Sequence, residues 1–171
     1  MSKAQSGMVS LERMTRERFH ELYRDFIFDP CMFMDISLCE KCNARGYDKT
    51  EVDARFDKHA GDDSCLPFAV MLKGKIIGEV VIKHIDREKK QCELGIHLQN
   101  DAVKGKGYGT EAERLAIAYA INELSMERIL ADSIIKNTRS QHILEKLGFR
   151  QTGESNGFKQ YELRKTDLKQ E

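Results

Sequence analysis

A glycine-rich stretch at residues 104–111 holds the residue types and spacing that most clearly indicate chemistry. Three glycines within five positions let the backbone adopt positive φ and leave no Cβ between it and a ligand. Several amide N–H groups can then converge on one anion, and a helix starting there adds partial positive charge. Lys104 and Lys106 can add full charges. The stretch therefore predicts a site for a pyrophosphate.

Two better-known phosphate loops do not match this spacing. A P-loop needs Gly, four residues, Gly, Lys and then Ser or Thr, and that order is absent. A dinucleotide fingerprint needs G-x-G-x-x-G after the first strand of a parallel unit, whereas Gly105, Gly107 and Gly109 alternate with single residues. A plain glycine turn that caps a helix is the remaining structural alternative.

The elements that would position the loop follow from the hydrophobic period along the chain. Residues 31–47 have no clear period and are expected to be loop with a short helix. We expect strands at 8–14, 67–72, 76–85, 91–98, 128–134, 149–152 and 158–163, and helices at 15–28, 49–59, 110–124 and 137–147.

The expected order is β-α-α-β-β-β-α-β-α-β-β. Short polar turns at 73–75 and 86–90 make the middle three strands antiparallel. Within the helical segments, Thr15 is the expected N-cap of the first helix and Gly148 occupies a C-cap position after the last. The fold class is α+β, an α/β sandwich with a mixed, mostly antiparallel central sheet and helices on both faces.

Length and composition limit the possible classes of protein. A chain of 171 residues fits one domain over 1–171, and 28 basic against 28 acidic residues argue against a nucleic-acid-binding surface. We find no apolar run long enough to span a bilayer and no signal peptide at residues 1–10. The five cysteines, an odd number, are expected to be free thiols. We therefore predict a cytoplasmic protein without membrane or nucleic-acid partners.

Three segments in a fixed order carry a resemblance to a known family. They are Glu93-Leu94-Gly95-Ile96, the run Lys104-Gly105-Lys106-Gly107-Tyr108-Gly109, and Asn137-Thr138-Arg139-Ser140 followed by Glu145-Lys146-Leu147-Gly148-Phe149. Together they resemble the GNAT superfamily of N-acetyltransferases, most closely its ribosomal-protein-alanine and spermidine acetyltransferase branch. Lys104 stands where Gln or Arg is usual and keeps the positive charge. The resemblance covers about residues 67–163.

The resemblance implies acetyl-CoA as co-substrate. The pantetheine would pair like an added strand with the backbone at residues 96–98, and the pyrophosphate would lie on the amides of the glycine loop. An amine would attack the thioester directly in a ternary complex, without a covalent enzyme intermediate. The residues expected to bind the co-substrate are Ile96, His97, Leu98, Lys104, Gly105, Lys106, Gly107, Tyr108, Gly109, Thr110 and Asn137.

The resemblance also suggests catalytic residues. Glu93 is the candidate base, since similar enzymes use a glutamate on this strand, and a solvated strand carboxylate is its structural alternative. Many relatives carry a tyrosine acid four residues after the position of Ser140, where this chain has Leu144. Ser140 can assist through a water, or no acid is needed because a thiolate is a tolerable leaving group. His97 lies close to the expected oxyanion site and is a weaker candidate.

Several points stay open at the level of sequence. Cys39 and Cys42 form a C-x-x-C without a second ligand pair, so no metal site is predicted. The acceptor is either a small-molecule amine or a protein N-terminus, and the sequence does not choose between them. A non-catalytic acyl-CoA-binding sensor of the same fold is the alternative function, and a homodimer is compatible with the fold.

Overall fold

The computed structural model describes residues 4–5 and 8–168, which form one eight-stranded sheet. The strands lie in the order β1-β2-β3-β4-β5-β6-β8-β7, and β5–β6 is the parallel pair among antiparallel ones. The sheet is therefore mixed and mostly antiparallel, as predicted. The strands are β1 (Ala4–Gln5), β2 (Ser10–Arg13), β3 (Leu66–Leu72), β4 (Lys75–Asp86), β5 (Gln91–Leu98), β6 (Arg128–Ile134), β7 (Arg150–Ser155) and β8 (Phe158–Arg164).

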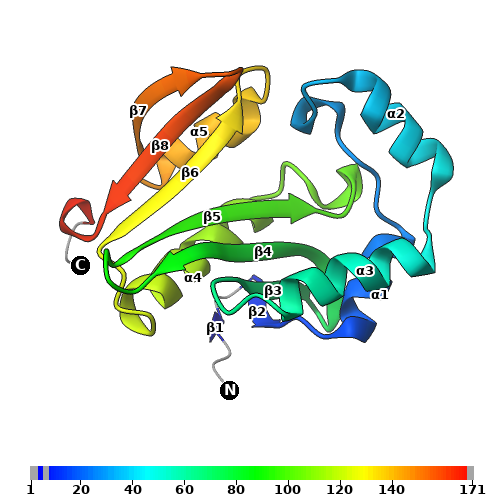
Figure 1. Ribbon diagram of the computed structural model, residues 1–171, viewed down its shortest axis with the longest axis horizontal. Coiled ribbons are helices and arrows are strands. Elements are labelled where there is room, and N and C mark those ends of the chain that lie inside the picture. Colours follow the sequence, from blue (N-terminus) through cyan, green and yellow to red (C-terminus); the bar gives the residue numbers. More distant parts are fainter. Residues whose placement is uncertain (1–3, 6–7, 169–171) are drawn as a thin grey trace.

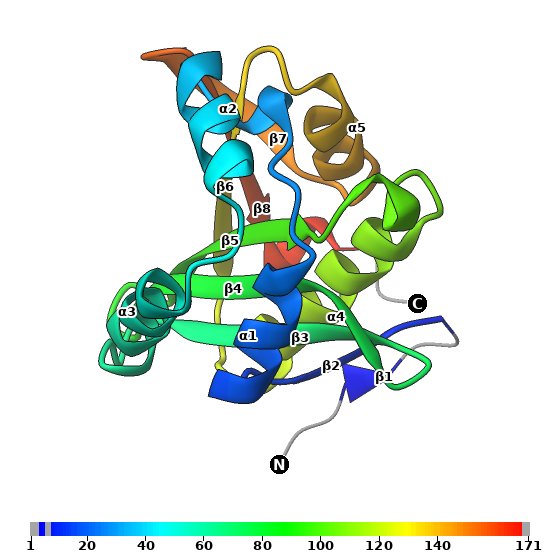
Figure 2. The same ribbon diagram turned by 90° about the vertical axis from the view of Figure 1, so that its right-hand side faces the viewer.

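Helices cover both faces of this sheet. The helices are α1 (Arg16–Arg24), α2 (Ile36–Arg45), α3 (Lys49–Ala60), α4 (Tyr108–Asn122) and α5 (Thr138–Lys146). In Figure 2, α1 and α3 lie on one side of β3 and β4, and α4 lies on the other. These positions confirm the α+β class with helices on both faces. Among the described residues, no helix combines the length and the apolar character needed to cross a membrane.

The structure adds the short strand β1 to the expected order, and it shows the helix α2 in the segment 31–47, which was expected to be loop with a short helix. α2 lies in the segment whose sequence shows no clear period. Cys39 is its one buried side chain, so α2 lacks the apolar stripe on which a helix prediction depends. Local polar signals define it instead, because the Asp35 side chain accepts a hydrogen bond from the Ser37 N–H at 2.9 Å.

Helix α1 begins where the sequence predicts but ends four residues earlier. Thr15 caps it by accepting a hydrogen bond from the Arg18 N–H at 3.2 Å. The expected end near Phe28 is wrong, since α1 stops at Arg24. Beyond it, the Ile27 N–H donates to the Gln99 carbonyl at 2.8 Å, which ties the chain to the residue that follows β5. This tie brings the next segment, including a 3₁₀ turn at Pro30–Met32, toward the end of β5.

The parallel pair β5–β6 opens into a fork. Residues 91–93 of β5 pair with residues 128–130 of β6, and the two strands then diverge (Figure 1). Beyond the vertex of the fork, β5 stays paired with β4, and β6 stays paired with β8. Each strand therefore presents one backbone edge without a strand partner to the space between them.

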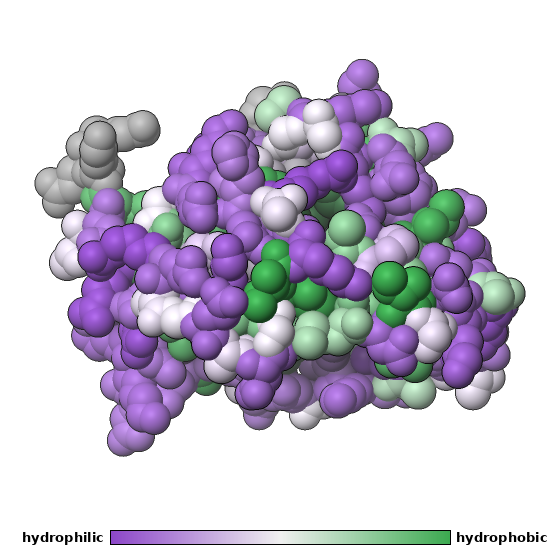
Figure 3. Space-filling model, turned by 90° about the horizontal axis from the view of Figure 1, so that it is seen from above, coloured by the Kyte–Doolittle hydropathy of each residue, from purple (hydrophilic) through white to green (hydrophobic). Residues whose placement is uncertain are grey.

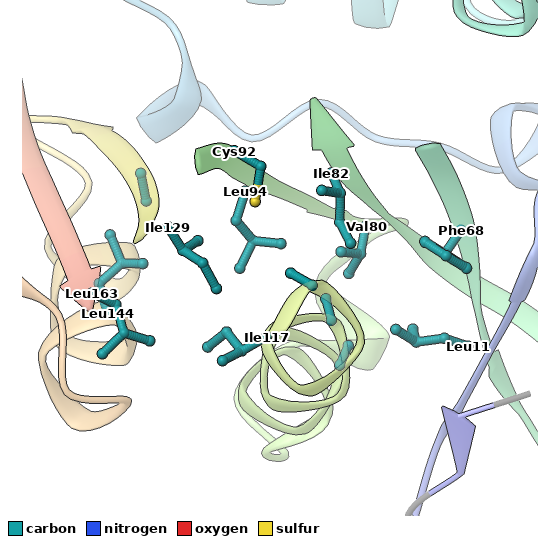
Figure 4. Close-up of a cluster of buried hydrophobic side chains, with 14 of the residues drawn as sticks. Leu11, Phe68, Val80, Ile82, Cys92, Leu94, Ile117, Ile129, Leu144 and Leu163 are labelled. Carbon is teal, nitrogen blue, oxygen red and sulfur yellow. The ribbon is translucent and has the colours of Figure 1, made fainter. Parts of the chain in front are cut away.

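The main core lies between the sheet and α4. In Figure 4, Leu94 of β5 and Ile129 of β6 point toward Ile117 of α4, and Leu144 of α5 lies beyond Ile129. All four side chains are buried, and fully burying such a side chain is worth about 1.5–3 kcal/mol. A second cluster packs α1 and α3 onto the opposite face around Phe19. The two cores therefore hold the sheet from both of its faces.

Candidate functional site

The fork contains a cavity of about 270 Å³. Its walls come from both diverging strands, from α4 and α5, and from the turn after α1. Seen from the top of Figure 1, apolar side chains gather over the middle of this face (Figure 3). Six residues that the sequence assigned to a site line the cavity together: Ile96, His97, Leu98, Lys104, Asn137 and Ser140.

The glycine loop runs from this cavity to the start of α4. Gly105 and Gly107 have φ of +71° and +85°, which non-glycine residues rarely adopt. α4 begins at Tyr108, two residues earlier than predicted, and its N-cap Gly107 makes no side-chain cap bond. The Glu111 N–H donates to the Gly107 carbonyl, so the amides ahead of it precede the helical ladder. The loop thus presents free N–H donors and the positive end of a helix dipole.

Gly109 matters for packing rather than for backbone conformation. A Cβ at this position would lie 3.5 Å from the Leu98 side chain and 3.8 Å from that of Ile96. The first turn of α4 therefore packs closely under the end of β5. This contact fixes the distance between the edge of β5 and the amides of the loop.

The two lysines of the loop have different surroundings. The Lys104 side chain is 11% exposed, and its Nζ lies 3.1 Å from Asp29 and 3.6 Å from Asp101. Burial acts to raise the pKa of Asp29, but the Cys31 N–H and the Lys104 ammonium outweigh it and lower that pKa. Lys106 is exposed. Lys104 therefore joins the loop to the turn after α1, and Lys106 stays open to a ligand.

Asn137 and Ser140 lie on the opposite wall, at the start of α5. The Asn137 side chain caps α5 by accepting from the Ser140 N–H at 3.2 Å. Gln141, which the sequence did not indicate, is buried and donates to the carbonyls of Ile134 and Ile135 at 3.1 and 2.7 Å. These bonds fix α5 to the end of β6, and they hold Asn137 and Ser140 in the cavity wall.

Glu93 lies at the vertex of the fork rather than in the cavity wall. It is the last β5 residue paired with β6, and its side chain is 21% exposed. Its carboxylate accepts from Lys83 at 3.2 Å and from His84 Nδ1 at 2.8 Å. Its charge, after burial, helps to raise the pKa of Asp132 on β6. Glu93 is therefore near the cavity, but each of its two oxygens already contacts a basic side chain.

The sequence did not indicate a polar cluster that lies on the α1 side of β4 and β5. Glu79 is 2% exposed and lies opposite His97 in the strand register. The Tyr23 hydroxyl donates to Glu79 at 2.8 Å and accepts from Arg55 at 3.2 Å. Burial raises the pKa of Glu79, and burial together with the Arg55 charge lowers that of His97 to about 4. The one detectable sequence signal is a lone acid within the apolar run of β4.

Aromatic rings continue this cluster toward the turn after α1. Tyr23 stacks on Phe26 with ring centroids 4.8 Å apart, and Phe28 meets Phe26 at 4.9 Å and Phe33 at 5.8 Å. Cys39 on α2 packs beneath them, with its Sγ 3.3 Å from the Phe28 carbonyl. Within residues 8–168, no group of three or more metal-ligating side chains comes together. The C-x-x-C therefore lies on a helix that covers the aromatic cluster.

Solved structures share this architecture. The ribosomal L7/L12 alpha-N-protein acetyltransferase RimL, solved in complex with coenzyme A, matches 95% of this chain and 98% of its own, with a TM-score of 0.78 and 12% identity. A dodecameric spermidine N-acetyltransferase from Vibrio cholerae aligns with 94% of this chain over 96% of its own length, with a TM-score of 0.70 and 19% identity. At these identities the comparison establishes a shared fold.

Curated relatives are more similar in sequence over shorter stretches. The spermidine N(1)-acetyltransferase of Escherichia coli strain K12 is 31% identical over 104 residues, 61% of this chain and 55% of that protein. The probable N-acetyltransferase YjcK of Bacillus subtilis strain 168 is 38% identical over 79 residues, which are 46% of this chain and 44% of that protein. The chain spans about half the length of the curated relatives it matches. These relatives agree with the branch that the sequence resembles.

A family model decides the classification. The acetyltransferase (GNAT) domain matches residues 9–150, most of the chain. That span contains the fork, the glycine loop and α5. With the fold and the cavity already consistent with it, the chain belongs to the GNAT acetyltransferase family.

Proposed function

We propose that this protein is an acetyl-CoA-dependent N-acetyltransferase that acts on a primary amine by direct attack in a ternary complex. The observation that carries the proposal is the fork between β5 and β6, with the glycine loop at its open end. Acetyl-CoA supplies the acetyl group as a thioester. Five free cysteines suit a reducing compartment, which supports a cytoplasmic location.

Three features of the described residues fit acetyl-CoA. The β5 edge beyond Glu93 has backbone groups without a strand partner, which suits the amides of a pantetheine arm. The N–H groups at the start of α4, next to Lys106, suit a pyrophosphate. The apolar side chains of Leu94 and Ile96 line the cavity between these two regions and suit the uncharged part of the arm.

The acceptor amine would enter from the α1 side of the sheet. The aromatic rings around Phe26 and the carboxyl groups of Glu79 and Asp132 lie on that side, and they suit a cationic amine. Glu93 remains our candidate base, acting once its ion pairs with Lys83 and His84 rearrange or through a water. A panel that holds both small amines and N-terminal peptides distinguishes the two kinds of acceptor.

A turnover assay tests this function. We expect purified protein to release thiol from acetyl-CoA only when a suitable primary amine is added from a panel of polyamines, amino acids and N-terminal peptides. Mass spectrometry should then find one acetyl group added per thiol released. Hydrolysis without an acetylated amine would contradict the proposal.

One observation favours an alternative, a sensor that binds acyl-CoA without turnover. Leu144 leaves α5 without an acid at that position in the cavity wall, and the Glu93 carboxylate is held by Lys83 and His84. Calorimetry with acetyl-CoA distinguishes the two functions. Tight binding without turnover of any amine in the panel would favour the sensor, and binding with amine-dependent turnover would favour the enzyme.

A further inference from the structure

Glu113 is a buried acid that no part of the proposed function uses. It lies in the second turn of α4, and only 4% of its surface is exposed. Its Oε2 atom has no hydrogen-bond partner, although the residue lines the cavity in the fork. A buried polar atom without a partner costs roughly 1–3 kcal/mol, so such a group calls for a physical reason.

The buried neighbours of Glu113 on its own helix are apolar. Gly109, Ala112, Ala116 and Ile117 are buried around it and pack α4 onto the sheet. Glu113 nevertheless lines the cavity in the fork, which lies between these apolar residues and the diverging strands. Glu113 is therefore a buried acid in the wall of the site that a ligand in the fork would occupy.

The other acids that line the cavity differ from Glu113 in their surroundings. Asp29 has the Lys104 ammonium 3.1 Å away, and its pKa is lowered, so it holds no proton at neutral pH. Asp132 is exposed and faces away from Ala131 and the α4 side of β6. Glu113 is thus the buried acid on the α4 side of the fork.

Two of the basic groups that line the cavity are held by carboxylates. Lys83 pairs with Glu93 at 3.2 Å, and the Lys104 ammonium is held by Asp29. Arg139 is exposed and lies on α5. His97 is neutral, since burial lowers its pKa to about 4.

Leu144 forms part of the α5 wall of the same cavity. It is 2% exposed and apolar, so this position cannot donate a proton. Figure 4 shows Leu144 beside Leu163, and Ile129 lies between Leu144 and α4. On this wall Ser140 carries the hydroxyl, whereas Glu113 supplies a carboxyl from the α4 wall.

We propose that Glu113 is the general acid of the acetyl transfer, and that its carboxyl proton goes to the sulfur that leaves the acetyl group. The proposal rests on the acetyltransferase function proposed above. As the amine nitrogen forms the new C–N bond, the C–S bond breaks and its electron pair stays on sulfur. The sulfur takes the Glu113 proton, the nitrogen loses its own proton on the acceptor side, and Glu113 regains a proton from water.

The protonation state of Glu113 agrees with this role. Burial alone raises its pKa to about 8, so the carboxyl is protonated at neutral pH. The pKa of an alkyl thiol is about 8.5, so the pKa of the acid is close to that of the leaving group. Efficient general acid catalysis requires such a match.

The test compares Glu113→Gln with the unchanged protein over a range of pH. Gln keeps the size and the ability to donate a hydrogen bond but has no proton to give. We expect kcat to fall about 100-fold and the affinity for coenzyme A to stay within about threefold. The decline of kcat above about pH 8, expected for the unchanged protein, should disappear in the variant. Unchanged kcat with the same alkaline decline would overturn the proposal.

Two controls tie the effect to the proton of Glu113. Glu123→Gln makes the same change at an exposed residue next to the end of α4 and should leave kcat unchanged. Carbon-13 NMR of the Glu113 carboxyl in the free protein measures its pKa without any turnover, and an ordinary value would overturn the proposal. Weaker coenzyme A binding with the alkaline decline retained would also overturn it, because Glu113 would then be a binding residue.

The remaining outcomes are also decisive. If Glu113→Gln does not fold, Glu113→Met replaces it and should show the same loss of kcat, whereas full activity would overturn the proposal. If the unchanged protein turns over no amine, the proposed function fails, and the role of Glu113 fails with it. If the unchanged protein is active and the Glu113 variants are equally active, the role of Glu113 alone fails.

Discussion

Among single residues, the site combines groups that a motif can reveal with groups that only burial reveals. The loop glycines, Asn137 and Ser140 can be found from the sequence because their types and spacing form a pattern. Glu79 and Glu113 cannot, because one acid within an apolar segment looks like a solvated position until the fold buries it. Glu79 has the Tyr23 hydroxyl as a partner, whereas Oε2 of Glu113 has none.

The unpartnered carboxyl of Glu113 predicts how stability depends on pH. The folded-state pKa of Glu113 is about 8, above the usual 4.5, so the folded chain holds a proton that the unfolded chain releases between these values. Stability is therefore lost as pH rises through this window. Glu113→Gln removes the loss, so it should gain roughly 3–4 kcal/mol over the unchanged protein between about pH 5 and pH 8.

Urea unfolding of both proteins at the two pH values measures this gain. The difference between the proteins isolates Glu113, because all other titrating groups are common to them. A difference that does not change with pH would show that Glu113 titrates normally. Glu123→Gln is again the matched control and should show no such gain.

Among the strands and helices, those with a clear period are predictable, and those defined by tertiary contacts are not. The alternation of apolar residues gives the bounds of β5 and β6 correctly. The short helix expected within residues 31–47 has no predicted bounds, because α2 has one buried side chain. The predicted end of α1 is late, and the chain beyond it is tied to Gln99 by the Ile27 N–H. The predicted start of α4 is two residues late, since a helix that begins after a left-handed glycine has no polar N-cap to mark it.

The left-handed N-cap of α4 leads to a prediction about binding. Gly107→Ala puts a Cβ on a residue with φ of +85°, which should cost about 1–2 kcal/mol of stability or shift the loop. The backbone N–H groups of the loop would then no longer converge on an anion, so we expect coenzyme A affinity to fall at least about tenfold. Isothermal titration calorimetry measures the affinity.

Gly74→Ala provides the matched control for this change. Gly74 has φ of +81° in the turn between β3 and β4, and a Cβ there would meet nothing within 4 Å. It should lose similar stability but bind coenzyme A normally. Equal affinities for the two variants would show that the loop conformation at Gly107 does not matter for binding.

For the molecule as a whole, the site is a consequence of strand pairing over long distances. β8, from near the end of the chain, pairs along all of β6 and draws it away from β5 beyond Leu130. The separate cores around Phe19 and Ile117 hold the two faces of the sheet. No local pattern encodes this fork, so the sequence alone predicts its position through resemblance to a family. The single domain over 1–171, the absence of a metal and a homodimer stay predictions.

A crystal structure of the protein with coenzyme A would test the proposed site in the fork. We predict that the pantetheine lies in the fork against the backbone of residues 96–98 and that the pyrophosphate lies on the amides at the start of α4. The thiol should then be within hydrogen-bonding distance of the Glu113 carboxyl. Coenzyme A bound outside the fork would contradict the proposed function, and a thiol far from Glu113 would contradict its role as the acid.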